Sequence, residues 1–237
     1  MYRFIRTAAI VFAFVINGAA ARAQTAVDPT GHWEGIVQVP GMDIAFQIDF
    51  TKNGGDAVIG TVNIPAEKLA GLPLRSVVVE GRSIRFQART DQYFDGTIVE
   101  EGRSISGSYH VDDAAVPFTM TRTGDARMAP PTTSAPIGKE LEGRWTATMN
   151  VGGGMRLVLT MQNHEDGTSS GIIENQDQGG LQIPVKIEQD GTRVVLDITV
   201  VGGSFAATLN ASGNELAGTY TQKGKSVPLT FTRAAAR

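Results

Sequence analysis

Apolar and polar residues alternate with a period of two along most of the chain. Between residues 43 and 51, every second residue is large and apolar, namely Ile44, Phe46, Ile48 and Phe50. The same period recurs in residues 83–89 and 155–162. A period of two places successive side chains on opposite faces of an extended strand, whereas a helix repeats every ~3.6 residues. Glycine, asparagine and aspartate separate the runs, as turns between antiparallel strands require. The pattern predicts an all-β protein whose strands each bury one face.

One segment of the sequence occurs twice. Residues 104–122 and 215–233 share six residue types at a constant offset of 111 positions. The shared residues are Gly107, Tyr109, Pro117, Thr119, Thr121 and Arg122, repeated as Gly218, Tyr220, Pro228, Thr230, Thr232 and Arg233. A constant offset across a hairpin indicates that one structural unit has been duplicated.

The duplication divides the chain into two units. We expect a first β-barrel at residues 29–124, a linker rich in proline, threonine, serine and alanine at 125–139, and a second β-barrel at 140–234. Residues 65–73 offer one short helical turn, whereas residues 177–184 are expected to form a loop. The predicted fold is therefore two tandem eight-stranded antiparallel barrels. The linker composition predicts a semi-extended connection rather than a packed element.

Each unit carries one tryptophan near its start and one arginine on its last strand. Each arginine continues the apolar face of its strand, where an unpaired charge would be costly. Closure of an antiparallel barrel brings the first and last strands together. We therefore expect Arg122 to cover Trp33 in the first unit, and Arg233 to cover Trp145 in the second. A cation–π contact of this kind is worth about 0.5–2 kcal/mol.

The Gly-x-Trp motif beginning at Gly31 and again at Gly143, combined with these arginines, resembles the calycin superfamily. This superfamily contains lipocalins, fatty-acid-binding proteins and small barrel inhibitors of bacterial metalloproteases. The second unit is also similar to a lipocalin-like module that precedes periplasmic α/β hydrolases, through residues 177–185, 218–224 and 227–233. The first unit lacks the DQGG sequence of that module, and no hydrolase follows the second. The resemblance implies barrels that hold a small ligand or contact a partner protein.

Residues 1–23 have the pattern of a secretory signal peptide. Arg3 and Arg6 precede an apolar run at residues 8–16, and Ala-Arg-Ala at 21–23 matches a cleavage site. The run is too short for a transmembrane anchor, which needs about 20 apolar residues. We therefore expect a periplasmic or secreted protein that does not span the membrane after signal cleavage.

Composition narrows the possible partners. The chain contains no cysteine, which excludes disulfides, thiolate metal sites and a lipidated N-terminal cysteine. Its formal net charge is −3, and loss of residues 1–23 would remove three arginines and no acid. Because an acidic chain gains little from binding a polyanion, nucleic acid is not an expected partner. A membrane barrel is disfavoured, since Arg85, Arg89 and Arg156 on the expected outer faces would be costly in lipid.

The sequence offers no catalytic constellation. His32, His110 and His164 have no metal-ligand spacing, and we expect them on strand faces or in solvent. Paired acidic residues fall in expected turns, and a Gly-x-Ser-x-Gly nucleophile motif is missing. We therefore expect a non-enzymatic protein without a cofactor or metal.

Two functions remain open. The first is a binding protein for a small apolar or amphipathic ligand inside a barrel; the second is a protein-interaction module, such as an inhibitor or accessory of a periplasmic enzyme. Phenylalanines are expected to fill the first unit. The second unit is expected to be roomier and to bind the ligand through Ala147, Phe205, Ala207, Gly218 and Tyr220.

Overall fold

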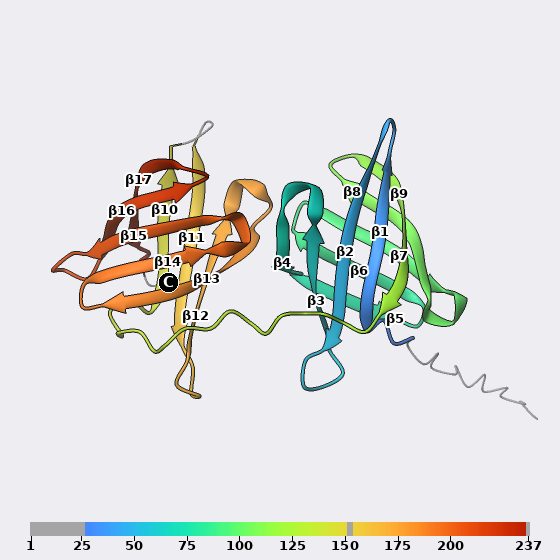
Figure 1. Cartoon of the computed structure of the whole chain (residues 1–237), viewed down its shortest axis with the longest axis horizontal. Coiled ribbons are helices and arrows are strands. Elements are labelled where there is room, and N and C mark those ends of the chain that lie inside the picture. The colour runs from blue at the N-terminus through green and yellow to red at the C-terminus, as the bar shows by residue number, and fades with distance from the viewer. Residues whose placement is uncertain (1–26, 151–153, 236–237) are drawn as a thin grey trace, which may run out of the picture.

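The computed structural model describes residues 27–150 and 154–235 (Figure 1). The signal peptide expected at residues 1–23 lies outside the described residues. The fold is all-β, with short 3₁₀ turns as its only helical segments in the described ranges. None of these segments is long and apolar enough to cross a bilayer.

The strands form two separate sheets. The first sheet contains nine strands: β1 (Gly31–Val39), β2 (Met42–Lys52), β3 (Val58–Ile64), β4 (Leu69–Pro73), β5 (Ser76–Glu80), β6 (Ser83–Arg89), β7 (Gln92–Val99), β8 (Ser104–Val111) and β9 (Ala114–Gly124). The second sheet is a closed barrel of eight strands: β10 (Gly143–Met149), β11 (Met155–Asn163), β12 (Ser169–Asn175), β13 (Leu181–Asp190), β14 (Arg193–Ile198), β15 (Gly203–Leu209), β16 (Glu215–Gln222) and β17 (Lys225–Arg233). The 3₁₀ turns are η1 (Pro65–Glu67), η2 (Glu100–Gly102), η3 (Gln176–Gln178) and η4 (Thr199–Val201).

The first sheet differs from the eight-stranded closed barrel that the sequence predicts. Its order is β4-β3-β2-β1-β9-β8-β7-β6-β5, so it curls but remains open between β4 and β5. Only Leu74 and Arg75 join these two edge strands. The N–H of Leu74 donates to Gly60 O at 2.8 Å, and that of Arg75 donates to Gln87 O at 2.7 Å. The chain therefore crosses the opening with one hydrogen bond to each side.

The ninth strand arises because one strand of the repeat is interrupted. In the barrel, β13 is continuous; its first half pairs with β12 and its second half with β14. In the first sheet, β4 pairs with β3 and β5 pairs with β6. The two short strands together therefore take the position that β13 has in the barrel. The interruption follows Pro73, whose counterpart 111 positions later is Pro184 within β13. The expected helical turn at residues 65–73 is confined to η1, and the expected loop at 177–184 is η3 followed by β13.

Each sheet encloses an apolar core made by the inward faces of its strands. Trp33 and Trp145 are both fully buried at the point where the first and last strands of their sheets pair. Their indole N–H groups donate to Pro29 O at 2.8 Å and Leu141 O at 2.9 Å, respectively. Each large ring is thereby packed with its polar atom satisfied.

The linker is more ordered than its composition predicts. Ser134 forms an isolated bridge with Ser169 of β12, with both backbone hydrogen bonds at 2.9 Å. The N–H of Ile137 donates to Asn163 Oδ1, and the Ile137 side chain is buried in the barrel core. The expectation of an unpacked linker at 125–139 is therefore wrong for its second half, which lies on the barrel.

The first sheet and the barrel contact each other through their β-hairpins. Arg75 donates to Gly180 O at 2.9 Å and lies 3.4 Å from a carboxylate oxygen of Glu174. Leu181 and Val200 of the barrel pack against the core of the first sheet. In Figure 1, β4 lies on the side of the first sheet that faces the barrel. The barrel thus covers the end of the first sheet at which β3 and β4 are joined.

Candidate functional site

An apolar cavity lies within the first sheet, at the end covered by the barrel. Its volume is about 410 Å³. Most of its walls are aliphatic or aromatic side chains from the inward faces of β1 to β4, β6 and β7: Val37, Ile44, Phe46, Ile48, Val62, Ile64, Leu69, Leu72, Ala88 and Phe94. Because inward residues alternate with polar outward ones, the strand pattern itself supplies this apolar lining.

Phenylalanines pack against one another in the core of the first sheet, and two of them, Phe46 and Phe94, also form part of the cavity wall. Phe86 and Phe94 stack at 4.7 Å with their planes 7° apart, and Phe118 meets Phe94 edge-on at 5.1 Å. These contacts pack the interior below the cavity. The first sheet therefore combines a closed aromatic core with an open apolar end.

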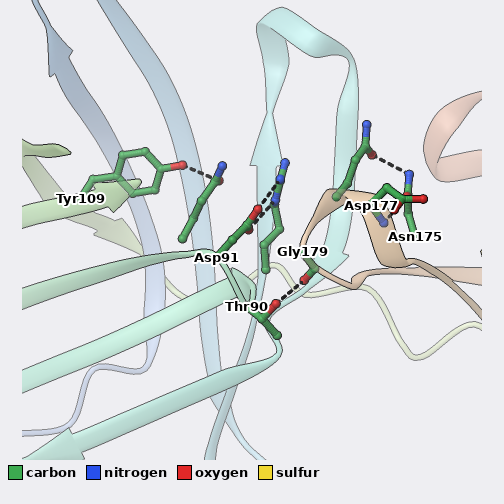
Figure 2. Close-up of polar contacts among 9 residues, drawn as sticks. Thr90, Asp91, Tyr109, Asn175, Asp177 and Gly179 are labelled. Atoms are coloured by element: carbon green, nitrogen blue, oxygen red, sulfur yellow. Dashed lines mark hydrogen bonds and ion pairs between the residues drawn. The ribbon is translucent and has the colours of Figure 1, made fainter. Parts of the chain in front are cut away.

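Polar groups gather at the mouth of the cavity. The Tyr109 hydroxyl donates to Gln92 Oε1 at 2.5 Å, and Figure 2 marks this hydrogen bond at the labelled Tyr109. Burial raises the pKa of Tyr109, although the nearby Arg89 opposes that shift, so the hydroxyl stays protonated at neutral pH. Arg89 also lines the cavity and makes two hydrogen bonds to Asp91, at 3.0 and 2.8 Å. The contact with Arg89 lowers the pKa of the Asp91 carboxyl.

The barrel supplies part of the cavity wall. Gln178 and Leu181, from the β12–β13 hairpin, line the cavity beside residues of the first sheet. The backbone N–H of Thr90 donates to Gly179 O at 2.8 Å, and Thr90 Oγ1 donates to the same oxygen at 3.1 Å (Figure 2). Gly179 has φ +61°, and a Cβ at this position would collide with the Asp91 carboxylate. A glycine therefore permits the close approach of the hairpin to the mouth.

The structure places the five residues that the sequence selects as a ligand site close to the barrel core: Phe205 pairs with Tyr220 and Ala207 with Gly218 on β15 and β16, and Ala147 packs against the same core. Phe205 and Tyr220 line a second interior cavity in the barrel, with a volume of only about 60 Å³. Ala207 is buried in the barrel core and Ala147 packs against that core, but neither side chain lines this cavity. A Cβ on Gly218 would collide with the backbone of Ala206, so this glycine serves strand contact rather than cavity space.

The duplication explains why the two cavities differ in size. Phe94 and Tyr109 of the larger cavity stand 111 positions before Phe205 and Tyr220 of the smaller one. In the barrel, long or branched residues occupy the equivalent space: Met149, Met155, Leu157, Ile198, Val201 and Leu229. The expectation that the second unit is roomier is therefore wrong, because these side chains close its interior.

Both arginines of the repeat lie over their tryptophans. Arg122 Cζ is 5.0 Å from the ring centroid of Trp33, and Arg233 Cζ is 4.4 Å from that of Trp145. These residues lie where the first and last strands of each sheet pair, away from the cavity-lining set. They hold the sheets together and do not reach a ligand in the cavity.

The histidines differ in their surroundings. His32 lies on a face of strand β1, as one of the expected positions, but it is buried, and its Nδ1 lies 2.8 Å from Oδ1 of the buried Asp49. His110 stacks on Tyr93 at 4.4 Å, and the exposed His164 lies 2.8 Å from Ser170 Oγ. The described residues contain no group of three or more histidine, cysteine or acidic side chains that could hold a metal ion.

Comparisons with known proteins show only weak likeness. No protein-family model matches the chain, and no curated protein matches it. A solved structure of a Nostoc punctiforme protein of unknown function from the DUF3598 family is 14% identical. The likeness covers 86% of this chain and 96% of that one, with a TM-score of 0.25.

Proposed function

We propose that this protein is a non-enzymatic binding protein that holds a small apolar or amphipathic ligand in the cavity of the first sheet. The observation that carries the proposal is the cavity of about 410 Å³ with apolar walls and polar groups at its mouth. Ligand pockets typically measure about 300–1,000 Å³ and combine apolar walls with few convergent polar groups. The apolar body of the ligand would lie against residues such as Leu72 and Phe94, with its polar end near Tyr109.

We also propose that both units are lipocalin-like barrels. Eight paired strand positions per repeat, counting β4 and β5 as one interrupted strand, support two related barrels in tandem. The repeated pair of tryptophan and arginine supports a relationship to the calycin superfamily. We place the binding function in the periplasm or outside the cell, following the signal-peptide pattern of residues 1–23.

An apolar fluorescent probe, such as anilinonaphthalene sulfonate, tests the proposal on the whole chain. Saturable binding of one probe is expected, and Ala88→Trp should weaken it at least tenfold because an indole would occupy the cavity that Ala88 lines. The matched control is Ala206→Trp, since Ala206 is exposed on the outside of the barrel. It should leave binding unchanged.

Thermal unfolding must accompany the titration, because a destabilised variant exposes apolar surface that also binds the probe. An unaltered melting temperature with lost binding supports the cavity as the site. Absence of saturable binding to the unmodified chain, or equal affinity of Ala88→Trp, overturns the proposal.

A further inference from the structure

The two charged side chains that line the cavity of the first sheet differ in their partners. Glu67, at the end of η1, and Arg89, at the end of β6, both form part of the cavity wall. Arg89 makes two hydrogen bonds to the Asp91 carboxylate, at 3.0 and 2.8 Å, and this bidentate contact offsets its charge (Figure 2). Glu67 forms no ion pair in the described part of the chain, and the adjacent Lys68 is exposed and lies outside the cavity wall. Glu67 is therefore the lining charge that remains available to a ligand.

Acidic side chains also dominate the surroundings of the Tyr109 hydroxyl at the mouth. Burial is the main cause of the raised pKa of Tyr109, and Arg89 opposes the rise. The negative charges of Asp91, Asp112 and Glu67 each raise this pKa further, because they disfavour a second negative charge on the phenol. Three carboxylates and one guanidinium thus act on the place where the polar end of a ligand would lie.

The hydrogen-bonding groups at the mouth favour a ligand that donates. The Tyr109 hydroxyl gives its proton to Gln92 Oε1, which leaves its own oxygen as an acceptor. The Glu67 carboxylate accepts only, whereas a primary ammonium carries three donors and no acceptor. The Gln92 amide can still donate, but it brings no positive charge to offset that of Glu67.

The duplication shows that the fold does not require a negative charge at residue 67. The turns η1 and η3 correspond at the offset of 111 positions, so Glu67 corresponds to Gln178. Both turns are followed by a residue in the left-handed region, Lys68 with φ 57° and Gly179 with φ 61°. The same turn therefore forms with a neutral amide in the barrel, whose interior cavity is only about 60 Å³. The acidic residue accompanies the larger cavity rather than the turn.

We infer that the ligand of this cavity is a cationic amphiphile, an alkyl chain that ends in an ammonium group, and that Glu67 selects it. This inference rests on the binding function proposed above. The chain would bury its methylene groups against the apolar wall, and the ammonium would face Glu67 and the Tyr109 oxygen at the mouth. A carboxylate in the same place would lose hydration near a like charge, so an anionic amphiphile of equal length should bind more weakly. The net charge of −3 also attracts cations at longer range.

The test uses the whole chain and three ligands with the same ten-carbon chain: decylammonium, decanol and decanoate. Each ligand displaces an uncharged fluorescent probe, N-phenyl-1-naphthylamine, and the displacement gives its affinity. Decylammonium should bind about tenfold more tightly than decanoate, with decanol between them. Added salt should narrow the difference between the two charged ligands, because it screens the exposed Glu67, and should not weaken decanol binding.

Two substitutions in the protein make the test specific. Glu67→Gln installs the residue that the barrel has at the equivalent position, and it should reduce the preference for decylammonium to about threefold or less. Its affinity for decanol should stay unchanged, which also shows that the variant keeps its fold. The matched control is Glu80→Gln, which removes the same charge from an exposed residue. Glu80 pairs with Ser83 at the end of the sheet away from Arg89, so this variant should keep the full preference.

The uncharged ligand separates the two ways in which the test can fail. If decanol binds but decanoate binds as tightly as decylammonium, the selection of a cation is overturned and the binding function stands. A preference that persists in Glu67→Gln likewise overturns the role of Glu67. Absence of binding by the probe and by all three ligands overturns the binding function itself, and this inference with it.

Discussion

Arg233 is held by more partners than Arg122, although both cover a tryptophan. Arg233 donates to the carbonyl oxygens of Gly213 at 3.1 Å and Glu142 at 2.8 Å, and also to that of Glu140. Arg122 donates to Asp28 O at 2.6 Å, and its buried Nε has no hydrogen-bond partner among the described residues. The Arg233 guanidinium thus ties two backbone segments, residues 140–142 and the turn at Gly213, to the end of the barrel.

Arg233→Ala should destabilise the barrel by about 2–4 kcal/mol. The loss combines a cation–π contact with hydrogen bonds to carbonyl groups that would be left without their charged donor. Arg156→Ala is the matched control because its side chain is 70% exposed and pairs with Asp177 at the surface, where solvent screening leaves an ion pair with little effect on stability. Denaturant midpoints measure both changes. Equal losses would show that the position of Arg233 at the end of the apolar face has no energetic consequence.

Alternation predicts which face of a strand a residue occupies, but not what covers that face. It assigns Asp49 to the polar face of β2, opposite Phe50. Asp49 is nevertheless only 2% exposed, because its carboxylate contacts His32 and accepts the N–H of Arg127 at 2.7 Å. The covering residue comes from the linker, 78 positions away. No local pattern in β2 contains that information.

At the scale of elements, residues 134–141 act as a strap across the barrel. Ser134 Oγ accepts the backbone N–H of Ile187 at 2.7 Å, within β13, and Ser169 Oγ donates to Ala135 O at 2.7 Å. Ile137 and Leu141 insert their side chains into the barrel core. A composition of proline, threonine and serine does not distinguish such a strap from a free linker, because its order comes from these tertiary contacts.

Ser134→Ala should destabilise the barrel by about 1–3 kcal/mol, since the buried N–H of Ile187 would lose its acceptor. Thr133→Ala is the control at the neighbouring exposed position and should change stability by less than about 0.5 kcal/mol. Denaturant unfolding followed by circular dichroism separates the two. A Ser134→Ala variant as stable as Thr133→Ala would contradict the strap.

The number of strands in the first sheet could be predicted from the sequence only in part. Alternating residues and turn glycines predict the strands of both units, and the structure confirms an all-β fold with one closed eight-stranded barrel. The interruption between β4 and β5 could not be predicted in this way. Pro73 precedes it, yet Pro184 at the equivalent position lies within the continuous β13. The difference depends on how each hairpin packs rather than on the proline alone.

At the scale of the whole molecule, the candidate site belongs to both sheets. The repeat predicts which residue types recur, and Tyr109 and Tyr220 do occupy corresponding cavities. Which copy keeps open space depends on the combined volume of side chains such as Met149 and Met155, which no single strand pattern reveals. The contribution of Leu181 from the barrel to the cavity of the first sheet likewise depends on contacts between the units.

Separation of the chain at residue 129 tests this shared site. Residues 129–237 keep the strap and should unfold cooperatively, as a closed barrel with its own core is expected to do. Residues 24–128 keep most of the cavity wall but lose Gln178 and Leu181. They should therefore bind the fluorescent probe about tenfold more weakly than the whole chain, because less apolar surface is buried and water reaches the mouth.

The fragments 24–128 and 129–237 test different contacts. A chain that begins at residue 138 lacks Ser134 and Ile137, so it should be less stable than residues 129–237 by about 3 kcal/mol. Full probe affinity in residues 24–128 would show that the barrel plays no part in the site, while leaving the cavity itself as the binding region. Loss of cooperative unfolding in residues 129–237 would instead show that the barrel depends on the first sheet for its stability, through the contacts of Arg75 with Glu174 and Gly180.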